Sequence, residues 1–275
     1  MYRILIVGMG YVGPATAGYF VAKKQKVYGL VRRPERIPEL EEAGVIPVLG
    51  DLANPESLQK IPAVDFIVVC PAPDGREDAA ARALYVDGIG HFLKAIPQKG
   101  RPSLVLYLSS TGVWGDPLEG WVEESVLPKP ETERQKILME AEQQILNSGY
   151  PAVIFRLAGI YGPGRNRIAS LQKGEWPAEE RDVYLNLIHR DDIAPAIETL
   201  FKKAEEGQVY IGADDEPVLK SEYYGWLAGR LKIEPKFHGI ADPARKGKRC
   251  RNAKLKSLGF AFKFPNFRAG YESFL

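Results

Sequence analysis

Short apolar runs alternate with longer amphipathic stretches along the first part of the chain. The apolar runs are rich in branched residues, as is typical of buried strands. They are Arg3–Val7, Val27–Val31, Val45–Val48, Val64–Val69, Leu104–Leu108 and Ala152–Arg156. Helix-like stretches lie between them, notably Tyr11–Ala22, Ala79–Ile96 and Glu131–Asn147. Strands that are apolar nearly throughout and are joined by helices predict a parallel sheet covered on both faces, a doubly wound α/β fold.

The alternation ends at about residue 157, and the rest of the chain has a different pattern. Gly159–Trp176 is rich in Gly, Arg and Asn, which predicts a loop with little regular structure. A helix is expected after Asp191, ending near Gly207, and a short strand is expected at Val209–Gly212.

The 275 residues suffice for one large or two small domains. We predict one unit at residues 1–157, which carries the sheet, and a smaller lobe at residues 158–275, with the chain returning to the sheet around residues 183–212. Hydrophobic residues make up 45% and charged residues 26% of the chain, which predicts a globular protein and excludes a disordered one. The longest apolar runs are far too short to span a membrane.

Cysteine content and charge exclude further classes. The two cysteines, Cys70 and Cys250, cannot form a disulfide framework, and no metal-ligand spacing surrounds them, so no metal is expected. No signal peptide is expected either, and a reducing cytoplasm is the predicted location. The net charge is +2, and the seven Lys and Arg residues within 245–256 form a segment too short to predict nucleic-acid binding.

A glycine-rich turn joins the first predicted strand to the first predicted helix, and it reads GMGYVG from Gly8 to Gly13. The first glycine permits the tight turn, the second lets a pyrophosphate approach the backbone, and the third lets the helix pack close to the strand. Free N–H groups and the helix dipole would then face the phosphates. This placement predicts a dinucleotide site that includes Gly8, Gly10, Tyr11, Val12 and Gly13.

The end of the second predicted strand indicates which dinucleotide is bound. An acid there would bind the ribose 2′-OH of NAD, whereas an arginine suits the 2′-phosphate of NADP. Val31 is followed by Arg32 and Arg33, and the first acid is Glu35. We therefore predict NADP rather than NAD, although two arginines at a strand end also occur in simple solvated turns.

Two further segments are expected beside the cofactor. Asp51 and Leu52 follow the third predicted strand and are expected near the adenine, unless Asp51 only caps a helix that begins near Pro55. Pro71 and Ala72 follow the fourth predicted strand and are expected along the cofactor, although prolines are also common in loops.

With these residues and several later motifs, the chain resembles the NAD(P)-dependent epimerase/dehydratase group of the extended short-chain dehydrogenases/reductases. The similarity covers nearly the whole chain. The motifs are Leu108–Gly115 (LSSTGVWG), Arg156–Gly164 (RLAGIYGPG), Ile188–Ala194 (IHRDDIA) and the tail Asn252–Phe260. The resemblance implies an NAD(P)-binding Rossmann fold with a small C-terminal substrate lobe, and an oxidoreductase, epimerase or dehydratase activity.

The resemblance also implies three catalytic groups: a Ser or Thr that orients the substrate oxygen, a Tyr that transfers a proton, and a Lys four residues after the Tyr. Ser110 falls on the Ser/Thr position, with Ser109 on the cofactor side and Thr111 on the substrate side. The Tyr is missing, because no Tyr lies between Tyr107 and Tyr150.

Two alignments of the helix that should carry the Tyr remain open. In one, Thr132 and Lys136 are four residues apart on one helix face, and Lys136 would hold the nicotinamide ribose. In the other, which is aligned on Glu142, the two positions carry Arg134 and Leu138. Both alignments place the chain in an atypical subgroup without the usual acid/base.

Other candidate groups follow the sixth predicted strand. Tyr161 is a candidate for the missing proton transfer. By the resemblance, Arg165, Asn166, Arg167 and Arg249 would face the substrate cleft, which suggests an anionic substrate such as a phosphate or a nucleotide-linked sugar. The alternative is that these long side chains only cover apolar surface between the two units.

Two functions of different classes remain open. The first is an NADP-dependent oxidoreductase, epimerase or dehydratase that acts on a small anionic or nucleotide-sugar-like molecule. The second, suggested by the missing Tyr, is a non-catalytic NADP-binding regulatory or redox-sensing protein. A homodimer could form through the helices within Ala79–Ile96 and Glu131–Asn147, whereas nucleic acid and membranes are not expected partners.

Overall fold

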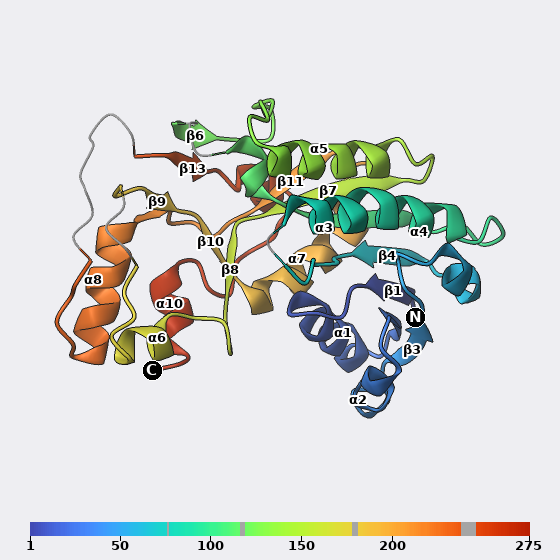
Figure 1. Ribbon diagram of the computed structural model, residues 1–275, viewed down its shortest axis with the longest axis horizontal. Coiled ribbons are helices and arrows are strands. Elements are labelled where there is room, and N and C mark those ends of the chain that lie inside the picture. The colour runs from blue at the N-terminus through green and yellow to red at the C-terminus, as the bar shows by residue number, and fades with distance from the viewer. Residues whose placement is uncertain (76, 116–118, 178–180, 238–245) are drawn as a thin grey trace.

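A seven-stranded sheet forms the centre of the computed structural model, which describes residues 1–75, 77–115, 119–177, 181–237 and 246–275 (Figure 1). Its strands are β1 (Arg3–Val7), β2 (Lys26–Val31), β3 (Ile46–Leu49), β4 (Phe66–Val69), β5 (Leu104–Ser110), β7 (Ala152–Leu157) and β11 (Val209–Gly212). Their order is β11-β7-β5-β4-β1-β2-β3, and every neighbouring pair is parallel. The predicted doubly wound α/β fold is confirmed.

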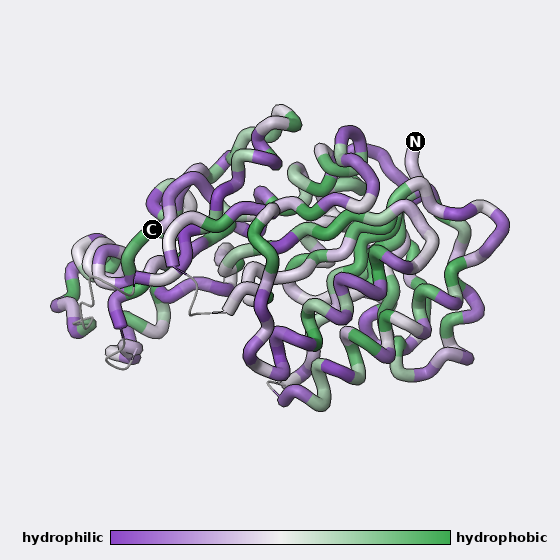
Figure 2. The backbone as a smooth tube through the Cα atoms, turned by 90° about the horizontal axis from the view of Figure 1, so that it is seen from above, coloured by the Kyte–Doolittle hydropathy of each residue, from purple (hydrophilic) through white to green (hydrophobic). Residues whose placement is uncertain are grey.

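Most of the strands are apolar nearly throughout because they face a core on each side of the sheet, whereas the edge strand β3 is partly exposed. Ile4 and Ile6 of β1 belong to the core that includes residues of α1 (Val12–Ala22) and α7 (Arg190–Lys203). Leu5 and Val7 alternate with them and belong to the opposite core, with residues of α4 (Ile89–Ala95) and α5 (Glu133–Leu146). Figure 2 shows the hydrophobic positions concentrated along these central strands.

Helices and tight turns connect the strands of the sheet. The helical elements on the N-terminal side are α2 (Ile37–Glu42), α3 (Asp78–Arg82), α4 (Ile89–Ala95) and α5 (Glu133–Leu146). A π-helical segment, Ala83–Gly88, joins α3 to α4, so the single helix predicted from Ala79 to Ile96 changes its winding along its length. Short 3-10 helices lie at Pro34–Arg36, Pro55–Lys60 and Thr111–Trp114.

The smaller lobe contains short strand pairs and helices around an aromatic core. Its elements, with the strand that joins it from the first unit, are β6 (Gly120–Val122), β8 (Gly159–Tyr161), α6 (Ile168–Gln172), β9 (Tyr184–Leu185), β10 (Leu187–His189), β12 (Val218–Leu219), α8 (Lys220–Leu231), β13 (Lys248–Cys250) and α10 (Phe267–Glu272). The helix α9 (Ala253–Ser257) contacts β11 instead, and its Leu255 belongs to the same core as Ile4 and Ile6 of β1. Strand β8 pairs with β10, β9 with β12, and β6 with β13. In the described part of the chain no helix has the length and apolar character needed to cross a membrane.

The prediction of an irregular loop over residues 159–176 was wrong in part. Gly159–Tyr161 forms β8 because it pairs with β10, a partner that lies far along the sequence. Leu171 is 2% exposed and anchors α6 in the lobe core. The glycines and arginines indicated the turns correctly, but the pairing that orders this segment is not local.

Candidate functional site

The glycine-rich turn follows β1 and leads into α1, and its three glycines have different environments. Gly8 has a φ of 108°, and a Cβ there would lie 2.6 Å from the carbonyl oxygen of Cys70. A Cβ on Gly13 would lie 2.1 Å from the carbonyl oxygen of Gly8. By contrast, a Cβ on Gly10 would meet no atom within 4 Å. The fold therefore requires glycine at the first and third positions, and at the second it leaves open space.

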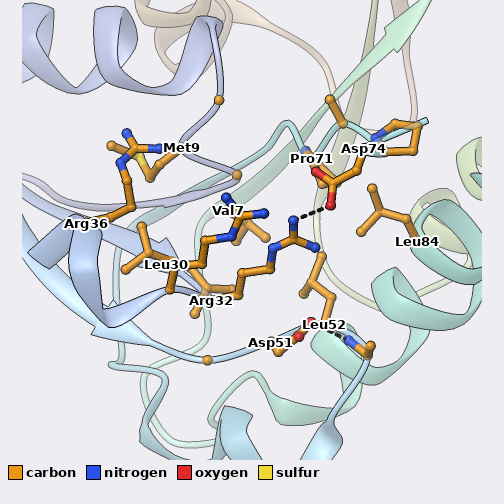
Figure 3. A pocket seen from close by; sticks show the side chains of 18 of the residues that line it. Val7, Met9, Leu30, Arg32, Arg36, Asp51, Leu52, Pro71, Asp74 and Leu84 are labelled. Carbon is orange, nitrogen blue, oxygen red and sulfur yellow. Dashed lines mark hydrogen bonds and ion pairs between the residues drawn. The ribbon is translucent and has the colours of Figure 1, made fainter. Parts of the chain in front are cut away.

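That open space belongs to a cavity of about 490 Å³ (Figure 3). Its walls come from the residues that follow four neighbouring strands, including Gly8 and Gly10 after β1, Arg32 after β2, Asp51 after β3 and Pro71 after β4. The carboxyl ends of β1 and β4 form the point where the strand order reverses, which is where open α/β sheets bind their ligands. The cavity thus brings together the predicted residues Gly8, Gly10, Arg32, Arg33, Asp51, Leu52, Pro71 and Ala72.

Three arginines, Arg32, Arg33 and Arg36, line one part of this cavity. The Arg32 guanidinium forms an ion pair with Asp74, and a hydrogen bond from Arg32 lowers the pKa of that carboxyl. Arg36 pairs with Glu39 at 2.7 Å between Nε and Oε2. Arg36 and Asp74 were not predicted from the sequence, although Asp74 lies just beyond the predicted Pro71-Ala72 segment.

Asp51 holds the shape of its own turn. Its Oδ1 accepts a hydrogen bond from the backbone N–H of Ala53 at 2.9 Å. The 3-10 helix at Pro55–Lys60 is capped instead by Asn54, whose side chain accepts from Glu56 N at 3.2 Å. The alternative of Asp51 as the cap of this helix is therefore wrong, and Asp51 remains a lining residue of the cavity.

Tyr11 connects the glycine-rich turn to the loop after β8. Its hydroxyl donates a hydrogen bond to the carbonyl oxygen of Pro163 at 3.0 Å. The guanidiniums of Arg165 and Arg190 lie 5.4 and 5.2 Å from its ring centroid, a cation–π arrangement. The ring thus faces the lobe, and the side chain of Tyr11 does not line the cavity described here.

The model of one protein family matches residues 4–211, and its description is "NAD dependent epimerase/dehydratase family". The chain belongs to this family. The resemblance stated from the sequence motifs is thereby confirmed. Protein YeeZ of Escherichia coli K12 is 27% identical to this chain, with 97% of each sequence covered.

Solved structures of related proteins agree with this membership. A protein of Methylobacillus flagellatus named for the NAD-dependent epimerases/dehydratases is 32% identical, covers 99% of this chain and 97% of its own, and superposes with a TM-score of 0.82. DesIV, a dTDP-glucose 4,6-dehydratase of Streptomyces venezuelae solved with NAD and TYD, also has a TM-score of 0.82, at 18% identity and with 98% and 95% of the chains covered. The second likeness shows the fold alone.

The Ser110 turn, where β5 ends, is the place at which the family resemblance puts the reacting groups. The Oγ of Ser110 accepts a hydrogen bond from Gly112 N at 3.0 Å and so caps the 3-10 helix Thr111–Trp114. Thr111 is buried, and its side chain hydrogen-bonds to the Cys250 thiol, whose pKa burial raises to about 11. Thr111 therefore contacts the interior of the protein.

Ser109 points away from the cavity into a buried polar network. Its Oγ donates to Glu142 Oε1 at 2.6 Å. Arg156 forms two hydrogen bonds to the same carboxylate, at 2.9 and 2.7 Å, and its guanidinium lies 4.5 Å from the Trp114 ring centroid. The hydroxyl predicted on the cofactor side is thus used inside the protein, where it links β5, α5 and β7.

The α5 face that packs on the Ser110 turn decides between the two alignments. The Cδ1 of Leu138 lies 3.9 Å from where a Cβ on Gly112 would be, and Leu138 belongs to the core cluster of Val113 and Trp114. Lys136 is exposed, and residues two apart do not share a helix face. The structure therefore supports the alignment with Arg134 and Leu138, and it does not bring Lys136 to the turn.

Tyr161, the candidate for the missing proton transfer, is 4% exposed in the lobe core. Its ring stacks on Tyr271 and meets His189 edge-on, and its hydroxyl donates to Asn266 O at 3.3 Å. Burial raises the pKa of this phenol, so it stays protonated at neutral pH and is a weaker proton donor than an ordinary tyrosine. Within the described residues, none of Ser110, Lys136 and Tyr161 lines the 490 Å³ cavity.

The predicted substrate residues lie in two separate environments. Arg165 faces Tyr11, the Asn166 amide donates to Gly162 O at 3.4 Å, and the backbone of Arg167 donates to the Tyr271 hydroxyl at 3.1 Å. Arg249 instead lies over the rings of Trp121 and Tyr184, at 4.7 and 5.1 Å. Among the described residues, these two segments share no hydrogen-bond or aromatic partner, so no such contact joins Arg165 to Arg249.

A second cavity, of about 550 Å³, lies in the lobe and was not foreseen from the sequence. Its basic residues are Arg181, Lys220 and Lys248, and Glu119 is its acid. Glu119 accepts a hydrogen bond from Gly247 N at 2.6 Å, and Lys248 donates to Gly115 O at 2.6 Å. Among the described residues, no group of His, Cys, Asp and Glu is arranged to hold a metal ion.

Proposed function

We propose that the 490 Å³ cavity binds NADP, with the pyrophosphate against the Gly8–Gly13 turn. The observation that carries this proposal is Gly10, because packing requires the other two glycines but leaves the space above Gly10 open. A ligand that needs close approach to the backbone explains a glycine at that position. Val12 begins α1, whose first turn contains no acid that would repel a phosphate. The residues present thus fit a dinucleotide.

The preference for NADP over NAD rests on charge. Arg32, Arg33 and Arg36 line the cavity at the end of β2 and just beyond it. Guanidiniums bind phosphate through paired, charge-assisted hydrogen bonds. A ribose hydroxyl is uncharged and has a single oxygen, so it binds a guanidinium less strongly. The related DesIV structure contains NAD, as does that of the UDP-glucuronic acid 4-epimerase of Bacillus cereus. NADP binding would distinguish this chain from them.

A bound nicotinamide would supply hydride transfer, the step that reductases, epimerases and dehydratases of this kind share. We propose that Ser110 orients the substrate oxygen, because its Oγ accepts from Gly112 N and keeps its own proton available for donation. On the other side of this turn, α5 presents Leu138 and offers neither a Tyr nor a Lys. The proton must therefore move through a group outside that face.

The second cavity supports a small anionic substrate. Among its described lining residues, Arg181, Lys220 and Lys248 outnumber Glu119, and Tyr184 and Asn186 add polar groups. A phosphate or a nucleotide-linked sugar would match this charge. Arg165 and Arg249 stay candidates for the edges of the substrate site. A homodimer through α4 and α5 and a cytoplasmic location also stay predictions.

One observation favours a second function, that of a cofactor-binding regulatory or redox-sensing protein. Leu138 fills the place beside the Ser110 turn with an apolar side chain that cannot transfer a proton. A protein that only senses nucleotide occupancy needs the cavity and the connection of Tyr11 to the lobe, but no acid/base.

Titration of the purified protein with NADPH and NADH, followed by calorimetry and by nucleotide fluorescence, tests the cofactor proposal. We expect NADPH to bind about tenfold or more tightly, because a hydrogen bond to a charged group contributes about 1.5–3 kcal/mol. Tighter binding of NADH would contradict the role of the arginines. If neither nucleotide bound below about 1 mM, a free energy of only about −4 kcal/mol, the proposal would fail.

Hydride exchange between labelled NADPH and a panel of carbonyl and sugar substrates separates the two functions. With any authentic substrate, Ser110→Ala should lower kcat by about a hundredfold, in the range of a lost positioned donor. Ser125→Ala is the matched control, because that hydroxyl is exposed and hydrogen-bonds to the nearby Glu123. No exchange with any substrate, together with tight NADPH binding, would favour the regulatory function.

A further inference from the structure

An ion pair crosses the cofactor cavity. Arg32 extends from the end of β2, and its NH2 group meets the Oδ2 of Asp74, which lies in the loop after β4 (Figure 3). Both residues line the cavity, and they are 42 positions apart in the sequence. The pair therefore joins the two sides of the space that the proposed dinucleotide would enter.

The partner of Arg32 is chemically similar to the group that Arg32 is proposed to bind. A carboxylate and a phosphate both present oxygen pairs that match the fork of a guanidinium. The Asp74 carboxyl stays ionised near neutral pH, since its hydrogen bond from Arg32 lowers its pKa. An arriving 2′-phosphate must therefore displace this carboxylate or share the guanidinium with it, at close range to a like charge.

We propose that Asp74 is a specificity-determining residue, whose carboxylate competes with the 2′-phosphate of NADP for Arg32. This inference rests on the proposed NADP site. The competition moderates the preference for NADP, because NAD carries a 2′-hydroxyl and gains little from Arg32 in either state. Asp74 also lies outside the arginine-rich segment. A prediction made from Arg32 and Arg33 alone therefore gives too strong a preference for NADP.

The expected gain in NADPH affinity is small because both side chains of the ion pair are exposed. The Arg32 and Asp74 side chains are 45% and 70% exposed, so water and salt weaken their attraction. Releasing Arg32 from such a pair should tighten NADPH binding by about two- to fivefold. NADH binding should change by less than about twofold, because its 2′-hydroxyl makes no ion pair that competes with Asp74.

The test compares Asp74→Asn with Asp78→Asn in titrations with NADPH and NADH at about 0.1 M salt. Asp78 is the matched control, because it also pairs with an arginine, at 2.9 Å from Arg134, but does not line the cavity. Both variants remove one negative charge, so a general attraction for anions would affect them equally. We expect the gain in NADPH affinity for Asp74→Asn only. Equal gains in both variants, or equal gains for both nucleotides, would overturn the inference.

Arg32→Gln, alone and combined with Asp74→Asn, completes a double-mutant cycle for the ion pair. Without Arg32, the second substitution should no longer improve NADPH binding by more than the Asp78→Asn control does. A gain that persists in the Arg32→Gln protein would show that Asp74 acts by some other route. Unchanged NADPH binding by Asp74→Asn would reject this inference and leave the proposed cofactor intact, whereas no binding of either nucleotide to the unmodified protein would reject both.

Discussion

The 490 Å³ cavity proposed to bind NADP and the Ser110 turn lie at the same edge of one sheet, but their side chains are used differently. In the cavity, the space at Gly10 is open and Arg33 is an exposed lining residue. At the turn, Ser109 hydrogen-bonds to Glu142, and Leu138 packs against the backbone. The cavity keeps open space at Gly10 and its ion pair, Arg32 with Asp74, is exposed, whereas the side chains at the turn are buried against one another. We therefore expect substitutions in the cavity to change binding, and substitutions around the turn to change stability.

The largest effect on stability is expected for Glu142→Ala. The substitution leaves Arg156, a residue that is 5% exposed, without its carboxylate partner. Breaking a buried pair in this way lowers the free energy of unfolding by about 3–5 kcal/mol. Urea unfolding measures this loss, and Glu140→Ala is the control.

Glu140 lies two residues away on the exposed side of α5 and pairs with Arg82 at 2.9 Å. Its loss should cost less than about 1 kcal/mol, as is usual for a surface pair. Similar losses for the two variants would mean that the buried network does not hold the turn. A selective loss of NADPH affinity in folded Glu142→Ala would remove the distinction between the two regions.

The next effect is a pH dependence that originates at His189. Burial lowers the pKa of this imidazole from 6.5 to about 4, so it is neutral in the folded protein at neutral pH. As the pH falls, the unfolded chain takes up this proton first, and the stabilisation present above pH 6.5 is lost between pH 6.5 and about 4. At about 1.4 kcal/mol per pKa unit, the loss amounts to about 3 kcal/mol.

Unfolding free energies measured at about pH 7 and about pH 4.5 in His189→Gln and in the unmodified protein isolate this contribution. The variant should lose less stability between the two pH values. His91→Gln is the control, because His91 makes one hydrogen bond to Leu52 O at 2.9 Å and is only half-buried. An equal pH dependence in all three proteins would exclude His189 as the source.

The sheet and the glycine-rich turn could be predicted because their causes are local. Branched residues at Arg3–Val7 and its counterparts specify buried strands, and glycine at position 8 satisfies a backbone with a φ of 108°. The strand pair formed by β8 and β10 could not be predicted, since it depends on residues that meet only after the lobe has folded.

The candidate site shows the same limit. Arg32, Asp51 and Pro71 could be placed together, because the ends of parallel strands meet at one edge of a sheet. The rotation of α5, which exposes Lys136 and buries Leu138, follows from packing against the Ser110 turn and not from helical spacing. The ion pair of Arg32 with Asp74 likewise joins two loops whose distance is not encoded in either of them.

The smallest effects come from a matched pair of substitutions within the glycine-rich turn. In Gly13→Ala, the added Cβ would lie 2.1 Å from the carbonyl oxygen of Gly8, so α1 and β1 must move apart. Such overpacking lowers the free energy of unfolding by about 1–3 kcal/mol. In Gly10→Ala, the added Cβ meets no atom within 4 Å, so stability should change by less than about 0.5 kcal/mol.

The same pair separates stability from binding. Because Gly10 lines the cavity, its new methyl group would occupy the space that a pyrophosphate needs, and NADPH affinity should fall about tenfold or more, a change of about 1.4 kcal/mol in binding free energy. Urea unfolding and NADPH titration give a free energy of unfolding and an NADPH affinity for each of the two variants. A stable Gly10→Ala protein with reduced affinity is the result expected of a ligand site. If Gly10→Ala kept its full affinity, the open space at Gly10 would be a feature of the fold alone, and the contrast between the cavity and the Ser110 turn would lose its physical basis.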